Sequence, residues 1–134
     1  MTDLVIVDAS AGVELLVDSV QGKRLRRLVP QGATLWVPEL FYVEVGSVLR
    51  RWSINHVIPD TAIVEAIRRL RAWPLHRARV RELFDEAWKL RHNFTFADGL
   101  YVALAVQLDA PVLTGDLNLA NAPNLPVPVL HIYS

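Results

Sequence analysis

The sequence predicts an α/β domain built on a mainly parallel sheet flanked by helices. Short apolar runs that are typical of buried strands alternate with longer segments whose apolar residues recur at helical spacing. Strands that are joined through helices pair in parallel, so this alternation favours a layered α/β fold. The chain has 134 residues, 52% of them hydrophobic, and shows no internal repeat or linker. We therefore assign residues 1–134 to a single domain.

Four strands are predicted from composition. The first, Leu4–Val7, is continuously apolar, as in a strand that is buried on both faces. A second covers 34–37 and a third 111–114. The last covers 127–132, where Pro128 favours a position at the edge of the sheet because proline cannot donate a ladder hydrogen bond.

Helices are predicted between these strands. Four of the six predicted helices cover 21–29, 39–52, 79–91 and 95–108. The other two begin at Ser10 and at Pro59. In 39–52 we assign the inward face to Leu40, Val43, Ser47 and either Val48 or Leu49. In the next helix we assign it to Ile63, Ile67 and Leu70.

Charge and composition restrict the classes of function. The 14 basic and 14 acidic residues cancel, and without cysteine there is neither a disulfide framework nor a thiolate metal site. No apolar run approaches the roughly 20 residues of a membrane span, and no signal peptide is recognised, so we expect a soluble cytoplasmic protein. Basic residues gather in 23–27 and 68–81. Either cluster is explained equally well by a solvated helix surface or by contacts to phosphates.

Four acids are candidates for a shared site, and each also has a structural explanation. Asp8 follows the first strand, where it could cap the next helix, and Asp116 follows the third strand in a Gly-Asp turn. Glu44 lies in an otherwise apolar helix but could occupy its solvent edge. Asp98 comes three residues after Thr95, as in a capping box.

The acids together favour a metal site. Strand ends of a doubly wound sheet meet at one edge, and the helices that carry Glu44 and Asp98 can pack against that edge. Carboxylates without cysteine or paired histidines suit a hard cation such as Mg²⁺ or Mn²⁺ better than zinc. We expect this site to be largely preformed and to serve phosphodiester cleavage.

The same residues resemble the PIN-domain nucleases, in particular the VapC-type toxins of bacterial toxin–antitoxin pairs. The matching segments are 6–10, 41–45, 96–105 and 113–116. Two positions depart from the usual pattern: Ala97 and Gly99 stand where tyrosine and alanine are common, and Gly99 is expected to loosen the first helical turn. Asn118 stands where some relatives have a further acid.

The resemblance implies a five-stranded parallel sheet and an Mg²⁺-dependent endoribonuclease, with Mn²⁺ as a substitute. It implies Asp8 and Asp98 as main metal ligands, Glu44 and Asp116 acting directly or through water, and Thr114 and Asn118 in support. It also implies a homodimer and a VapB-type antitoxin that reaches into the acidic site. Two alternatives remain: an α/β phosphatase or phosphotransfer domain, and a non-catalytic binding module with the same fold.

Overall fold

The computed structural model describes residues 3–133, which form five strands and seven helices. The strands are β1 (Leu4–Val7), β2 (Thr34–Pro38), β3 (His76–Ala78), β4 (Val112–Leu113) and β5 (Val129–Leu130). The helices are α1 (Ala9–Val17), α2 (Val20–Arg26), α3 (Leu40–Ile54), α4 (Asp60–Ala72), α5 (Val80–Lys89), α6 (Phe96–Leu108) and α7 (Leu117–Ala120). Every strand pairing is parallel. The predicted α/β fold is confirmed.

The strand order is β3-β2-β1-β4-β5. From β1 the chain first adds β2 and β3 on one side and then β4 and β5 on the other, so the order of addition reverses between β1 and β4. In such a sheet, ligands bind outside the carboxyl ends of the two strands at the reversal, because the segments that follow these strands leave toward opposite faces of the sheet. Val7 pairs with Leu113 in register, so Asp8 and Thr114 leave the sheet side by side. The chain therefore places two of the predicted site residues at this reversal.

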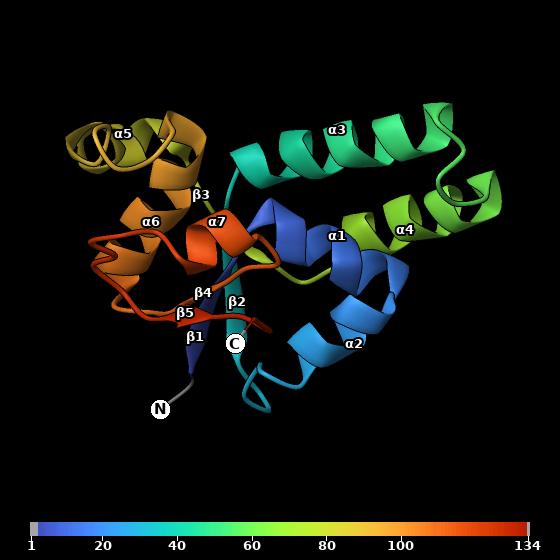
Figure 1. The fold of residues 1–134 in the computed structure, drawn as a ribbon, viewed down its shortest axis with the longest axis horizontal. Coiled ribbons are helices and arrows are strands. Elements are labelled where there is room, and N and C mark those ends of the chain that lie inside the picture. Colours follow the sequence, from blue (N-terminus) through green and yellow to red (C-terminus); the bar gives the residue numbers. More distant parts are fainter. Residues whose placement is uncertain (1–2, 134) are drawn as a thin grey trace.

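Helices cover both faces of the sheet (Figure 1). In that view α1, α2 and α4 lie on one side of the strands, and α5 and α6 lie on the other. The innermost strand β1 is fully buried at Val5, Ile6 and Val7, as its apolar run predicts. In α6, all seven residues from 99 to 105 are buried, because this helix packs on the sheet and also against α5.

The inward faces of two helices differ from the prediction. In α3 the buried side chains are Phe41, Val45 and Leu49, whereas Val43 is 65% exposed and Ser47 is also exposed. Because nearly every residue around this helix start is apolar, periodicity did not reveal which stripe faces the core. In α4 the inward positions are Ile63, Ala66 and Leu70, and Ile67 points outward.

Composition alone did not predict β3 or α7. His76 and Arg77 are exposed, so β3 lacks the apolar pattern of a strand; it pairs at the sheet edge, where His76 stacks on Trp36. The predicted edge position of the last strand is confirmed, but β5 is only two residues long. The second helix ends at Arg26, earlier than predicted, and residues 27–29 form turns. Within residues 3–133, no helix is long and apolar enough to cross a membrane.

Candidate active site

Asp8 is the most buried acid of the site, with 6% of its surface exposed. Its Oδ1 accepts hydrogen bonds from the backbone N–H of Ala11, at 2.9 Å, and from the hydroxyl of Ser10, at 2.7 Å. Asp8 therefore caps α1, as the structural explanation predicted, and also faces the carboxyl edge of the sheet. Burial raises the pKa of Asp8 to about 6, although the bonds from Ala11 and Ser10 favour its charged form.

Asp98 lies at the centre of the acidic group. It sits in the first turn of α6, where Thr95 Oγ1 accepts a hydrogen bond from its backbone N–H at 3.1 Å. Burial raises the pKa of Asp98, and the charge of Asp116 raises it further. Asp98 in turn raises the pKa of both Asp8 and Glu44. Each of the other three acids thus lies near enough to Asp98 for their charges to interact.

Glu44 is half-buried on α3 and is held by Tyr101, whose hydroxyl donates a 2.6 Å hydrogen bond to Glu44 Oε1. Burial raises the pKa of Glu44, whereas the bond from Tyr101 lowers it. Burial and the neighbouring acids raise the pKa of Tyr101, so its hydroxyl stays protonated as a donor. The bond joins α3 to α6 and fixes the position of Glu44 beside Asp98.

Thr114 and Ser10 connect the ends of β1 and β4. Their hydroxyls lie 3.3 Å apart, and Ser10 Oγ accepts a hydrogen bond from Gly115 N–H at 2.9 Å. Thr114 Oγ1 accepts a hydrogen bond from Asp116 N–H, at 3.0 Å. Tyr133 donates to the Gly115 carbonyl at 2.6 Å and so ties the end of the described chain to this turn. Thr114 is fully buried, and its supporting role in the site stays a prediction.

The outer part of the site is more open. The side chain of Asp116 caps the short helix α7 by accepting a hydrogen bond from Asn118 N–H at 2.9 Å. Asn118 itself is exposed, and it is its backbone that contacts Asp116. The supporting role of the Asn118 side chain stays a prediction.

The donor set fits a hard divalent cation in its chemistry but not in its spacing. Four carboxylates offer only oxygen ligands, which Mg²⁺ and Mn²⁺ prefer. Yet among residues 3–133 no three histidine or acidic side chains lie close enough together to hold a metal ion. The expectation of a largely preformed site is therefore wrong for this conformation. A cation at this site would require the carboxylates to move closer together, and its charge would compensate their mutual repulsion.

Two positions of the site were not predicted as functional. Ser10 and Tyr101 both lie within the segments that carry the family resemblance, but composition gives neither a distinct signal. A signal does exist for Tyr101: it follows Asp98 by three residues and therefore shares its helix face. Ser10 is two residues beyond the strand-ending Asp8, where a hydroxyl can bond the carboxylate.

Gly99 does not act as the sequence suggested. It is buried where α6 crosses α5, and an added Cβ would lie 3.3 Å from the Ala87 carbonyl oxygen. The glycine thus permits close packing of the two helices rather than simply loosening the turn that carries Asp98.

The basic stretch 68–81 is divided among α4, β3 and the start of α5. Arg68 and Arg69 pair with Glu65 at 2.5 and 3.2 Å, and Arg77 lies 3.7 Å from Glu39. The lack of acids within the stretch therefore does not make it a free basic surface. The hypothesis that basic residues of this stretch contact phosphates stays a prediction.

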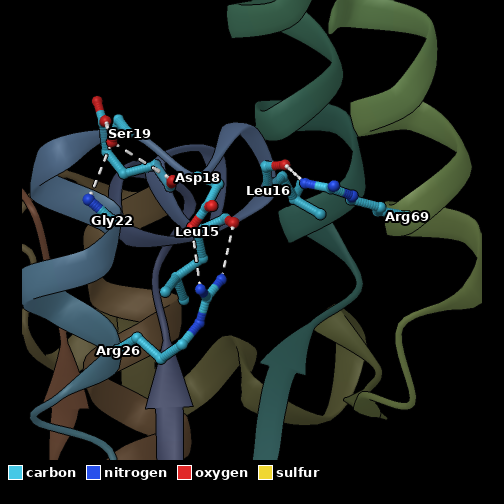
Figure 2. A network of polar contacts seen from close by, with 8 residues as sticks. Leu15, Leu16, Asp18, Ser19, Gly22, Arg26 and Arg69 are labelled. Atoms are coloured by element: carbon cyan, nitrogen blue, oxygen red, sulfur yellow. Dashed lines mark hydrogen bonds and ion pairs between the residues drawn. The ribbon is translucent and has the colours of Figure 1, made fainter.

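A separate cleft of about 520 Å³ opens between α1, α2 and α4. Its floor is apolar, with Leu15, Leu16, Val29 and Leu35, and arginines form its rim. Figure 2 shows Arg26 and Arg69 reaching the last turn of α1, where they donate to the carbonyls of Leu15 and Leu16 at 3.2 and 3.1 Å. Arg26 also pairs with Asp18 at 3.0 Å. These arginines satisfy carbonyls that the helix end leaves unpaired.

Comparison with known proteins agrees with this geometry. A family model described as PIN domain matches residues 5–125. Ribonuclease VapC1 of Mycobacterium tuberculosis is 41% identical, with 92% of this chain and 94% of the relative covered. Ribonuclease VapC12 of the same species is 33% identical, with 89% and 92% covered.

Solved structures share the fold at low sequence identity. VapBC2 from Rickettsia felis, bound to a promoter DNA fragment, has a TM-score of 0.68 at 11% identity and covers 97% of this chain and 99% of that chain. The sarcin-ricin loop cleaving toxin VapC20 of M. tuberculosis has a TM-score of 0.64 at 20% identity, with 88% and 95% covered. With its parallel sheet, its acids at the strand reversal and these relatives, the chain is a member of the PIN-domain family, in the group that contains the VapC ribonucleases.

Proposed function

We propose that the protein is an Mg²⁺-dependent endoribonuclease, the toxin of a type II toxin–antitoxin pair, acting on RNA in the cytoplasm. Ribonuclease activity is supported by VapC relatives that match nearly the whole chain. The observation that carries the proposal is the group of four carboxylates around Asp98 at the reversal of strand order. Mn²⁺ is expected to replace Mg²⁺, because both favour oxygen ligands.

Each residue of the site has a distinct role in this proposal. Asp8 and Asp98 would be the main metal ligands, and Glu44 and Asp116 would contribute directly or through water. The cation would neutralise charge on the phosphate and lower the pKa of the attacking water. Tyr101 holds Glu44 in place, and Ser10 holds Asp8 while linking it to the turn at Gly115. Thr114 orients the turn that carries Asp116.

The two alternatives are less well supported. A phosphotransfer domain of this architecture would need an activated aspartate, commonly with a lysine near the last strands, whereas no lysine follows Lys89. The residue two positions after Asp8 is Ser10, whose hydroxyl is already bonded to Asp8. A pure binding module would gain nothing from buried acids that raise one another's pKa.

The proposal is tested by RNA cleavage with Asp98→Asn and a matched control, Asp109→Asn. Asp98 and Asp109 lie at opposite ends of α6, and Asp109 has a φ of 51°, which asparagine tolerates. Asp98→Asn should reduce Mg²⁺-dependent cleavage by at least two orders of magnitude, or ~3 kcal/mol in barrier, while Asp109→Asn keeps it. Equal cleavage by both variants, or cleavage that persists in EDTA, would overturn the proposal.

The proposed partner is a VapB-type antitoxin, which the family membership and the solved VapBC complex support. The cleft between α1, α2 and α4 offers it an apolar floor with a cationic rim. An amphipathic segment with acidic residues would match both features. From there the antitoxin would extend toward the acidic site. A homodimer of this chain is part of the same proposal.

A further inference from the structure

A row of basic and aromatic side chains runs along the outer face of α5. Arg81, Phe84, Trp88 and Arg91 are spaced three, four and three residues apart, which puts them on one side of the helix and its following turn. Phe84 is 50% exposed and Trp88 is 53% exposed. We refer to these four residues as the α5 stripe. Large exposed aromatic rings between two cations are unusual on a surface without a binding role.

The main packing of α5 comes from side chains outside the α5 stripe. α5 is anchored by Leu83 and Ala87, which are buried and face α6. Glu82 and Glu86 lie on another side, where Glu86 pairs with Lys89 at 3.2 Å. Asp85 is the acid that borders the stripe. Phe84 also contacts Phe96 of α6, but about half of the Phe84 and Trp88 surfaces stays open to a ligand.

Trp88 is held in position by its neighbour. The Arg91 guanidinium lies 4.9 Å from the centre of the Trp88 ring, and Arg91 Nη1 donates to the Trp88 carbonyl at 3.0 Å. This cation–π pair leaves the ring half exposed. An ordered ring beside a cation is a ready platform for a stacked base with its phosphate nearby.

The stripe leads to the acidic site. The Phe84 ring lies 4.8 Å from the ring of Phe96, the first residue of α6. Asp98 follows two residues later in the same helical turn. Figure 1 shows α5 beside the beginning of α6, in agreement with their extensive contact. A ligand on the stripe would thus reach the helix turn that carries the central acid.

We propose that the α5 stripe binds unpaired nucleotides of the RNA substrate next to the bond that is cut. Bases stack on Trp88 and Phe84, while Arg81 and Arg91 contact phosphates. This inference rests on the proposed ribonuclease function and adds how the substrate is held. The two arginines beside the aromatic rings fit the phosphates and bases of RNA, and a contact with a second copy of the chain is the alternative that the test decides.

The test measures binding of a labelled single-stranded RNA of about 12 nucleotides in EDTA, which prevents metal-dependent cleavage. Trp88→Leu keeps an apolar side chain but removes the ring, and Trp88→Phe restores a ring. Val64→Ala, at a 65% exposed position on α4, is the matched control. Trp88→Leu should weaken binding about tenfold, whereas Trp88→Phe and Val64→Ala stay within about twofold of wild type.

Tryptophan fluorescence tests direct contact. RNA should quench part of the wild-type emission, and this quenching should be lost in Trp88→Phe although its affinity is retained. Sedimentation of each variant records the oligomeric state, and Mg²⁺-dependent cleavage by the wild type tests the proposed function separately. If the wild type cuts RNA and Trp88→Leu binds and cuts equally well, the stripe proposal fails alone. If Trp88→Leu instead dissociates an oligomer, the stripe is a contact between copies and the proposal is overturned.

Discussion

At the scale of single residues, the site depends on buried groups that are unfavourable on their own. Asp8 is nearly inaccessible and keeps its position through bonds from Ala11 and Ser10. Glu44 depends on one hydroxyl, that of Tyr101. Burial of these carboxylates raises their pKa values, so the metal-free protein carries an energetic cost at neutral pH. A bound cation would relieve that cost.

The first prediction concerns pH and the stability of the metal-free protein. Since the pKa of Asp8 is about 6 in the folded state against 3.8 as its ordinary value, protonation favours folding. This contribution is complete below about pH 4 and is lost as the pH rises through about 6. Urea unfolding in EDTA should therefore show the wild type losing about 2 kcal/mol from this group between pH 4.5 and 7.5. Asp8→Asn should show a correspondingly shallower pH dependence, and an unchanged slope would contradict the assignment.

The second prediction concerns Tyr101→Phe. Without the hydroxyl the pKa of Glu44 should rise further, because the lost hydrogen bond favours the carboxylate. We expect cleavage to fall about tenfold at neutral pH, and the acid limb of the pH–rate profile to move to higher pH. Tyr42→Phe, two residues before Glu44 on α3, is the matched control. A uniform loss at every pH would mean that Tyr101 acts only through folding.

At the scale of elements, the helices differ in how closely they approach their neighbours. α1 ends beside α2, and an added Cβ at Gly22 would meet the Glu14 carbonyl oxygen of α1 at 2.1 Å. α3 is different at Gly46, where an added Cβ would have no neighbour within 4 Å. Gly22 is thus required for the packing of α2 on α1, whereas Gly46 has room for a side chain, although both lie within helices.

The third prediction follows from this contrast. Gly22→Ala should destabilise the protein by about 1–3 kcal/mol, because backbone of α1 would have to move. Gly46→Ala should stabilise it by up to about 1 kcal/mol through helix propensity. Thermal unfolding of the two variants beside the wild type measures both effects. A Gly22→Ala variant as stable as the wild type would show that α1 and α2 are not packed as described.

At the scale of the whole molecule, the protein has no net charge but an uneven distribution of charge. Acids gather at the strand reversal, while arginines line the cleft between α1, α2 and α4 and flank the aromatic rings on α5. The acidic group and the basic groups thus lie on different parts of the molecule, as expected if the acids bind a cation and the basic groups contact an anionic substrate. Neutral composition alone did not reveal this arrangement.

The fourth prediction concerns the metal as a stabiliser of the whole fold. A cation that binds only the folded state raises the melting temperature by mass action. Mn²⁺ at about 100 times its dissociation constant should raise it by roughly 5–10 °C for a domain of this size. Asp8→Asn combined with Asp98→Asn should lose the shift. A wild-type melting curve that does not respond to millimolar Mn²⁺ would show that the acids do not form a cation site of useful affinity.

The sequence by itself predicted the fold class, four of the strands and the four acids that are candidates for the site. Apolar runs and helical spacing depend on local chemistry, and they are visible wherever burial is strong, as in Leu4–Val7 and Phe96–Leu108. The order of the matching segments added the fifth strand and the family. The weakly patterned β3 was not found by composition, since an exposed edge strand needs no apolar face.

Tertiary structure decided which surfaces meet. In α3 so many residues are apolar that only packing against α1 and the sheet shows that Val45, and not Val43, faces the core. The bond between Tyr101 and Glu44 joins residues 57 positions apart, and no local pattern encodes it. The separation of the acids is likewise a tertiary property. The acids come from different elements, so the distances between them depend on how those elements pack and not on their spacing along the chain.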